Sequence, residues 1–264
     1  MDLELKGRLA LVTGSTAGIG YAIAESLARE RCRVIVNGRT QKRVDAALVK
    51  LEGALGVADA VGFSADLGTA EGVAETVARF PHVDILVNNM GIFEPKPFAE
   101  IPDEDWLRFF EMNVLSGVRL SRHYLPRMIA AGWGRIIFIS SESAVQIPAE
   151  MIHYGMTKTA QLAVSRGLAE TTAGTGVTVN AVLPGPTASE GVEGFVDNKA
   201  ANRGTDRATI EREFFQNVRP SSLLRRFATP EEVAAMVTFV ASPLSAATNG
   251  AALRVDGGVV RSII

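Results

Sequence analysis

Short apolar segments alternate with longer segments of helical periodicity along the whole sequence, and this order constrains the fold more than any other feature. Segments such as 85–87 and 136–139 are continuously apolar, as expected for strands of a parallel sheet that helices cover on both faces. The expected strands are 9–13, 33–37, 60–64, 83–87, 135–140, 177–183 and 251–255. This repeated βαβ pattern predicts an α/β fold with a doubly wound, seven-stranded parallel sheet and helices on both faces.

Size and charge indicate one domain that acts on a small molecule. The 264 residues, of which 47% are hydrophobic, can form a single domain spanning 1–264. The 27 basic and 29 acidic residues give a formal charge of −2, which favours neither nucleic acid nor an anionic membrane as partner. Cys32 is the only cysteine, which excludes an internal disulfide and fits a reducing compartment. Residues 1–8 lack the pattern of a signal peptide, and no apolar stretch is long enough to cross a bilayer, so we expect a cytoplasmic protein.

One segment, at about 185–229, interrupts the alternation. It has no strand pattern, and Phe195, Ile210, Phe214 and Phe215 lie there among many charged residues. A long excursion from a compact domain is more often functional than not, so we predict a mobile substrate lid with one or two amphipathic helices. The alternative is an ordinary surface insertion.

A glycine-rich turn follows the first predicted strand. Gly14, Gly18 and Gly20 stand where the apolar run 9–13 ends and a helical pattern begins. Gly14 can form a tight turn, and the other two glycines allow the backbone to approach a pyrophosphate near the N–H groups of a helix N-terminus. The spacing G-x-x-x-G-x-G is a variant of the usual fingerprint, and such a turn can also be purely structural. It predicts dinucleotide binding and a Rossmann-type sheet.

Tyr154 and Lys158 are four residues apart, which places a phenol and an ammonium group on one helix face. A nearby cation favours phenolate and lowers the pKa of a tyrosine from about 10 toward the range of acid–base catalysis. The pair alone is weak evidence, because such spacing also arises by chance.

With these motifs, the sequence resembles the short-chain dehydrogenase/reductase family over nearly its whole length. The motifs occur in the family's order: the turn 13–20, Asn88-Asn89-Met90-Gly91, Asn113, Ser141, Tyr154 with Lys158, and Pro184-Gly185. The resemblance implies that Tyr154 is the general acid in carbonyl reduction and the base in alcohol oxidation, and that Ser141 hydrogen-bonds the substrate oxygen. It also implies that Lys158 lowers the pKa of Tyr154 and binds the nicotinamide ribose. Asn113 would hold a water that relays protons toward Lys158.

Each of these residues has a structural alternative. Ser141 can cap a backbone turn, and Asn113 can be a buried polar group of a helix. The family assigns a larger set to the cofactor: Gly14, Ser15, Thr16, Gly18, Ile19, Gly20, Arg39, Asp66, Leu67, Asn88, Met90, Gly91, Tyr154, Lys158, Pro184, Gly185, Thr187 and Ser189.

The end of the second strand favours NADP over NAD. Gly38 stands where NAD-preferring members carry an acidic residue, and the Arg39 guanidinium that follows suits a 2′-phosphate. Ala17 departs from relatives that place a second basic residue in the turn, and Met90 replaces the usual alanine. Pro186 has no backbone N–H, which makes the Thr187 amide the donor expected for the nicotinamide carboxamide.

The sequence contains little that supports metal-dependent or hydrolase chemistry. His82, His123 and His153 are scattered, and neither a zinc motif nor a nucleophile elbow is present, so we expect no metal. His153 could face the substrate, although a surface or helix-start position is favoured. Glu142, Gln146 and Glu150 are candidate polar contacts for the substrate.

The favoured function is an NADP-dependent oxidoreductase acting on a ketone or secondary alcohol, as a carbonyl reductase does. A 3-oxoacyl carrier-protein reductase is the alternative, although Gly132 and Thr175 occupy the positions where that enzyme has carrier-binding arginines. A non-catalytic dinucleotide-binding regulator is an alternative of another class. The last predicted strand, within 250–258, resembles the strand that pairs family subunits into homotetramers.

Overall fold

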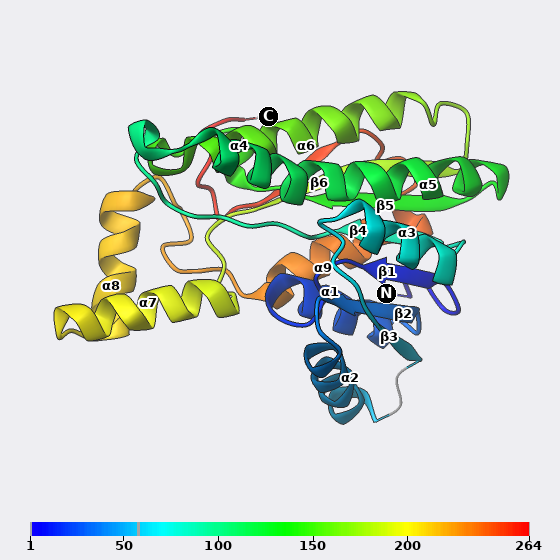
Figure 1. Cartoon of the computed structure of the whole chain (residues 1–264), viewed down its shortest axis with the longest axis horizontal. Coiled ribbons are helices and arrows are strands. Elements are labelled where there is room, and N and C mark those ends of the chain that lie inside the picture. Colours follow the sequence, from blue (N-terminus) through cyan, green and yellow to red (C-terminus); the bar gives the residue numbers. More distant parts are fainter. Residues whose placement is uncertain (1, 57–58, 264) are drawn as a thin grey trace.

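A computed structural model describes residues 2–56 and 59–263 and confirms the predicted sheet (Figure 1). Its strands form one sheet in the order β3-β2-β1-β4-β5-β6-β7, and every neighbouring pair is parallel. The strands are β1 (Leu9–Val12), β2 (Arg33–Gly38), β3 (Ala60–Ser64), β4 (Ile85–Asn88), β5 (Gly134–Ile139), β6 (Val177–Pro184) and β7 (Ala252–Val255). The strand order reverses between β1 and β4, which is where such sheets bind ligands.

Helices cover both faces of the sheet. On one face, α1 (Gly18–Arg29) packs against α9 (Pro230–Ala241), with α2 (Gln41–Leu55) beside them. The other face carries α3 (Ala70–Arg79), α4 (Asp103–Phe110), α5 (Ser116–Ala130) and α6 (Ile152–Glu170). A wide π-helical turn, η2 (Glu111–Leu115), joins α4 to α5, and short 3-10 turns lie at η1 (Phe98–Glu100), η3 (Glu142–Ala144), η4 (Ala149–Met151) and η6 (Pro243–Ser245).

Alternate strand residues supply the two halves of the core. Ala10 and Val12 of β1 join the cluster under α1 and α9, whereas Leu11 between them joins the cluster under α5. Ile137 and Ile136 of β5 divide in the same way. Successive strand side chains point to opposite faces, and here both faces are buried, which explains why the strands are continuously apolar. Burial of each leucine, isoleucine or valine side chain in this core stabilises the fold by about 1.5–3 kcal/mol.

The predicted excursion is helical and projects from the body as an arm. It holds α7 (Glu190–Arg203), α8 (Arg207–Glu213) and the π-helical η5 (Phe214–Val218), and Figure 1 shows α7 and α8 beyond one end of the sheet. Val196, Ala200 and Ile210 form a small core of its own. The Phe195 side chain lies outside the part of the chain that the structure describes.

The two ends of the arm meet. Thr187 pairs with Ala228 in a single parallel bridge, and the Ala188 N–H donates to the Ala228 carbonyl oxygen at 2.8 Å. The arm is therefore closed at its base, as a lid requires, while its predicted mobility stays a prediction. Across residues 2–56 and 59–263, no helix has the length and apolar character needed to span a membrane.

Candidate active site

The glycine turn between β1 and α1 has the geometry of an anion site. Gly14 and Gly18 have φ of 60° and 55°, which disfavour a side chain. A Cβ on Gly20 would lie 2.4 Å from the Gly14 carbonyl oxygen, so this position requires glycine. No side chain caps the N-terminus of α1, because its N-cap residue is Ala17. The first N–H groups of the helix thus remain available to a phosphate.

Ser15, a predicted cofactor contact, forms its hydrogen bonds within the protein. Its side chain is fully buried; the hydroxyl donates to the Val12 carbonyl oxygen at 2.7 Å and accepts from the Asn37 N–H at 2.9 Å. Its own backbone N–H donates to the Asn37 carbonyl oxygen. Both hydrogen-bond donors of Ser15, the hydroxyl and the backbone N–H, thus stabilise the turn. Thr16, by contrast, is only partly buried.

The loop after β4 is tied to the glycine turn. Asn89 Nδ2 donates to the carbonyl oxygens of Thr13 and Gly14, at 2.9 and 3.2 Å. Met90, the departure from the family pattern, packs against the core, and its N–H donates to Thr13 Oγ1 at 3.0 Å. Asn88 is buried, and its Nδ2 donates to the hydroxyl of a serine on α5 at 3.2 Å.

At the end of β2, a side chain in place of Gly38 would approach the Thr16 side chain closely. A Cβ on Gly38 would lie 2.5 Å from Thr16 Cγ2. Arg39 is exposed and forms no ion pair within the described residues, so its guanidinium remains available to a ligand. After β3, Asp66 accepts a hydrogen bond from the Gly68 N–H at 3.0 Å, and Leu67 is fully buried. These positions are outside the main cavity.

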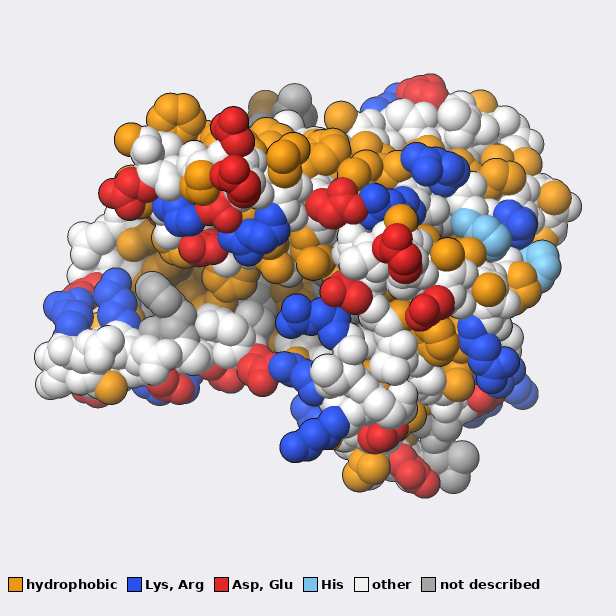
Figure 2. Space-filling view, in the orientation of Figure 1, with side chains coloured by type: hydrophobic (Ala, Val, Ile, Leu, Met, Phe, Trp, Pro, Cys, Tyr) orange, Lys and Arg blue, Asp and Glu red, His pale blue; other side chains and the backbone are white. Residues whose placement is uncertain are grey.

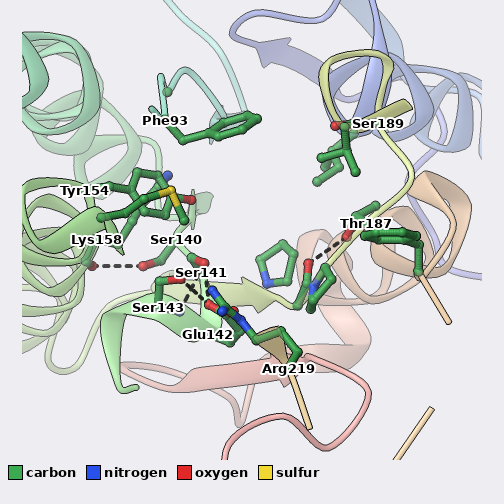
Figure 3. A pocket seen from close by; sticks show the side chains of 18 of the residues that line it. Phe93, Ser140, Ser141, Glu142, Ser143, Tyr154, Lys158, Thr187, Ser189 and Arg219 are labelled. Atoms are coloured by element: carbon green, nitrogen blue, oxygen red, sulfur yellow. Dashed lines mark hydrogen bonds and ion pairs between the residues drawn. The ribbon is translucent and has the colours of Figure 1, made fainter. Parts of the chain in front are cut away.

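A cavity of about 440 Å³ opens beyond the carboxyl ends of the strands, between the body and the arm. In Figure 2 it is a hollow with hydrophobic side chains inside. The predicted residues among its lining are Ile19, Gly91, Ser141, Tyr154, Lys158, Pro184, Gly185, Thr187 and Ser189, together with Glu142 and Glu150. Figure 3 shows how the catalytic candidates face this space.

The structure brings Ser141, Tyr154 and Lys158 together as predicted. Ser141 follows β5 and caps η3 by accepting a hydrogen bond from the Ser143 N–H at 3.1 Å. The structural alternative for Ser141 is therefore correct, and it coexists with a position at the cavity. Tyr154 lies beside Ser141 at the cavity, and Lys158 Nζ lies 5.6 Å from the centre of the Tyr154 ring. The four-residue spacing places both side chains on the same face of α6.

Burial dominates the electrostatics of the pair. It raises the pKa of Tyr154 to about 12, and the neighbouring Glu142 also raises it. Ser141 and Arg219 lower this pKa. Burial lowers the pKa of Lys158 to about 7. Lys158 is not among the groups that shift the pKa of Tyr154, and burial is the largest influence on both side chains, so the predicted effect of Lys158 on Tyr154 stays a prediction.

Asn113 lies in η2, but its side chain is already engaged. Its Oδ1 accepts from the Ile92 N–H at 2.8 Å, and its Nδ2 donates to the Ile92 carbonyl oxygen and to Thr157 Oγ1. Gln161, which the sequence reasoning missed, connects this residue to Lys158. Its Nε2 donates to the Asn113 carbonyl oxygen, and its Oε1 accepts from Lys158 Nζ at 3.3 Å. Gln161 is three residues from Lys158, a helical spacing that could have signalled it.

Two further side chains depart from expectation. His153 is at the start of α6 but is fully buried, with its ring 4.1 Å from that of Phe109, so it is neither on the surface nor at the cavity. Burial lowers its pKa. Arg219, which no sequence signal indicated, enters the cavity wall from the arm and contacts Glu142 and Glu150. Gln146 is exposed and does not line the cavity.

A parallel, doubly wound sheet with a cavity beyond the carboxyl ends of its strands defines an α/β protein of the Rossmann class. A family model described as "Enoyl-(Acyl carrier protein) reductase" matches residues 14–260. The chain is 52% identical over 265 residues to the uncharacterized oxidoreductase YvaG of Bacillus subtilis, with 100% of each chain covered. It is 32% identical over 263 residues to the 3-oxoacyl-[acyl-carrier-protein] reductase FabG of Aquifex aeolicus, which covers 98% of this chain and 100% of that one.

Solved structures show the same similarity. An L-sorbose reductase from Gluconobacter frateurii, complexed with NADPH and L-sorbose, aligns with a TM-score of 0.93 at 32% identity and covers 100% of both chains. A putative NAD(P)-dependent gluconate 5-dehydrogenase from Beutenbergia cavernae, with bound NADP, aligns with a TM-score of 0.84 at 34% identity and covers 99% of this chain and 100% of that one. The chain belongs to the short-chain dehydrogenase/reductase family and is an oxidoreductase.

Proposed function

We propose that the protein is an NADP(H)-dependent oxidoreductase that interconverts a ketone and a secondary alcohol. The observation that carries the proposal is the meeting of Ser141, Tyr154 and Lys158 at one cavity beside the glycine turn. When bound, NADPH would supply a hydride to the carbonyl carbon, and Tyr154 would give its proton to the carbonyl oxygen. Oxidation reverses both transfers, with Tyr154 as the base.

The residues present fit a nicotinamide dinucleotide. The open N-terminus of α1 and the turn at Gly14 and Gly18 suit a pyrophosphate. At the other end, the Thr187 N–H makes no hydrogen bond within the described chain and borders the cavity, as a donor to the carboxamide would. Arg39 and the absence of an acidic side chain at Gly38 favour NADP over NAD.

Tyr154, Ser141 and Lys158 have different roles in the proposed proton transfer. Tyr154, with a pKa raised to about 12, holds its proton at neutral pH and is therefore ready to act as an acid in reduction. Ser141 lies next to it; its hydroxyl donates to Glu142 Oε2 in this structure and would turn away from that carboxylate to donate to the same substrate oxygen. Lys158 Nζ, held by the Ile139 carbonyl oxygen at 2.9 Å, lies beside Gly91, where a Cβ would approach it to 3.3 Å. The hydrogen bond to Ile139 holds the amine, and the missing side chain of Gly91 leaves space beside it.

A Tyr154→Phe substitution tests the proposal. We expect loss of NADPH-linked ketone reduction by about 10²-fold or more, with NADPH affinity nearly unchanged, because only the proton donor is removed. NADPH oxidation measures turnover, and quenching of Trp106 and Trp133 fluorescence measures binding. Tyr124→Phe is the matched control: it also removes one phenol oxygen, which bonds the Phe80 carbonyl oxygen away from the cavity. Turnover that survives Tyr154→Phe would refute the mechanism.

The similarity to a 3-oxoacyl-[acyl-carrier-protein] reductase makes that activity the second candidate. Gly132 and Thr175, which stand in place of the carrier-binding arginines, provide no positive charge before β5 and β6. We therefore expect no preference for an acetoacetyl group on a carrier protein over the same group on a short thiol. A regulator without catalysis would have little need for the assembled Ser141, Tyr154 and Lys158.

We also propose a homotetramer. β7 is an edge strand, paired only with β6 within the described chain, and Phe239 of α9, a helix that contacts β7, and Leu244 of η6 are 39% and 45% exposed. An edge strand with exposed apolar neighbours is suited to pairing with a second copy. Small-angle scattering gives the mass in solution, and a monomeric mass would refute this assembly.

A further inference from the structure

Ionic side chains form one wall of the cavity beside the reacting groups. Arg219 Nε donates to Glu142 Oε1 at 2.9 Å, and its Nη1 donates to Glu150 Oε1 at 3.1 Å. The residues Glu142 and Arg219 are 4% and 9% exposed, whereas the Glu150 side chain is 44% exposed. Two carboxylates thus share one guanidinium. We call these three residues the ionic wall.

The ionic wall begins at the oxygen that is expected to bind the substrate. Ser141 Oγ donates to Glu142 Oε2 at 3.0 Å, and Ser143 Oγ bonds the same carboxylate oxygen. Figure 3 shows Ser141, Ser143, Glu142 and Arg219 joined in this way along one side of the cavity. Hydrogen bonds therefore connect Ser141, through Glu142 and Arg219, to Glu150.

The ionic wall offers hydrogen-bond donors and acceptors together. Arg219 Nη2 has two N–H donors without a partner in the described chain, and it is not among the fully enclosed atoms. Glu150 Oε2 has no hydrogen-bond partner in the same residues. Hydroxyl groups both donate and accept, so they can satisfy both kinds of atom. An apolar chain would remove water from these groups and return no hydrogen bond.

Charge disfavours an anionic substrate at this wall. A carboxylate or phosphate could reach Arg219 but would lie against Glu142 and Glu150, and juxtaposed like charges are repelled. Lys199 of α7 also lines the cavity, so the cavity as a whole is not acidic. The repulsion applies to groups placed along the ionic wall itself.

The opposite side of the cavity is apolar. Phe93 is 49% exposed, and its ring meets that of Tyr154 edge to face, with the centroids 6.3 Å apart. Figure 3 places Phe93 across the cavity from Glu142 and Arg219. A sugar or polyol has hydroxyl edges and C–H faces, and this division matches the two sides of the cavity.

We propose that the substrate is an uncharged polyhydroxylated ketone, or the corresponding sugar alcohol. Its hydroxyl groups beyond the reacting carbon bind the ionic wall, and its C–H surface packs on Phe93. This inference rests on the proposed ketone reductase activity and narrows its substrate class.

Substrates matched in chain length separate the two proposals. With NADPH and the full chain, we expect kcat/KM for at least one of D-fructose and L-sorbose to exceed those for 2-hexanone and 5-oxo-D-gluconate by about tenfold or more. Higher values for 2-hexanone or for the oxo acid would overturn the inference and support the proposed function. Failure to bind NADPH and to reduce any ketone would overturn the proposed function itself.

A Glu150→Leu substitution tests the wall directly. We expect KM for the preferred ketohexose to rise about tenfold, with kcat and the 2-hexanone values within about twofold, because one acceptor for a substrate hydroxyl is lost. Glu150→Gln, which keeps an acceptor oxygen, restores part of the affinity. Glu52→Leu on the exposed face of α2 is the control and changes neither substrate. Equal losses with both ketones would overturn the role of the wall, as would a change in NADPH affinity.

Discussion

A Lys158→Met substitution removes a buried amine whose charge the folded protein stabilises poorly. Lys158 is 4% exposed, and Nζ donates to the Ile139 carbonyl oxygen at 2.9 Å and to Gln161 Oε1 at 3.3 Å. Both acceptors are uncharged. Burial therefore lowers the pKa of the amine from 10.5 to about 7.

The sign of the effect on stability follows from proton binding. Between pH 7 and 10.5 the unfolded chain holds the Lys158 proton more often than the folded chain, so the free energy of unfolding rises with pH in this window. For these two pKa values the lysine destabilises the fold by about 5 kcal/mol at pH 6 and about 2 kcal/mol at pH 9. Methionine removes that penalty. It also leaves the oxygens of Ile139 and Gln161 without a donor, which costs about 1–3 kcal/mol each and does not depend on pH.

The testable quantity is the difference in unfolding free energy between variant and wild type. We expect this difference to fall by about 2–3 kcal/mol from pH 6 to pH 9, whatever its absolute value. Urea unfolding of cofactor-free protein, at a fixed protomer concentration, measures it. Lys42→Met, at an exposed position of α2, is the control and should show no such dependence. A difference that stays constant within about 0.5 kcal/mol would show that Lys158 keeps an ordinary pKa, and would refute the reasoning.

Three further outcomes follow from the site. Arg39→Ala should weaken NADPH binding about tenfold and leave NADH binding within about twofold, because one charged contact to the 2′-phosphate is lost; equal effects on both cofactors, by fluorescence titration, would contradict this. Gly20→Ala should destabilise the fold by about 1–3 kcal/mol, because its Cβ lies 2.4 Å from the Gly14 carbonyl oxygen; an unchanged thermal midpoint would contradict the turn geometry. Absorbance at 295 nm should show no tyrosinate below about pH 11 in the cofactor-free native protein, because burial raises the pKa of Tyr154 to about 12 and of the other two tyrosines as well. A titration step between pH 7 and 10 that disappears in Tyr154→Phe would instead support the predicted influence of Lys158.

Local patterns were sufficient for the framework of the fold. The continuous apolar runs predicted each strand of the sheet, with boundaries that differ from the structure by no more than two residues, as at β4. The turn at Gly14 and Gly18 could also be predicted, because glycine has no side chain and readily adopts a positive φ. The spacing of Tyr154 and Lys158 predicted that they share one helix face, because residues four apart in a helix lie on the same side of it.

The surroundings of individual side chains could not be predicted from these local patterns. His153 looks polar in sequence, but α6 buries it against Phe109. Ser15 belongs to the cofactor motif, yet its hydroxyl braces β1 and β2. Arg219 lies 77 residues from its partner Glu142 in the chain, so no local pattern could join them. These outcomes depend on which segments the fold brings together.

The sequence by itself determined the sheet, the glycine turn and which side chains are the catalytic candidates, because hydrophobic periodicity, backbone stereochemistry and helical spacing are local properties. The tertiary structure alone decided how those side chains ionise and what surrounds them. Burial raises the pKa of Tyr154 and lowers that of Lys158, and the fold of the arm onto the body carries Arg219 to Glu142 and Glu150. Desolvation and long-range contacts arise only after the chain has folded, and they determine the charge and the surroundings of the side chains at the cavity.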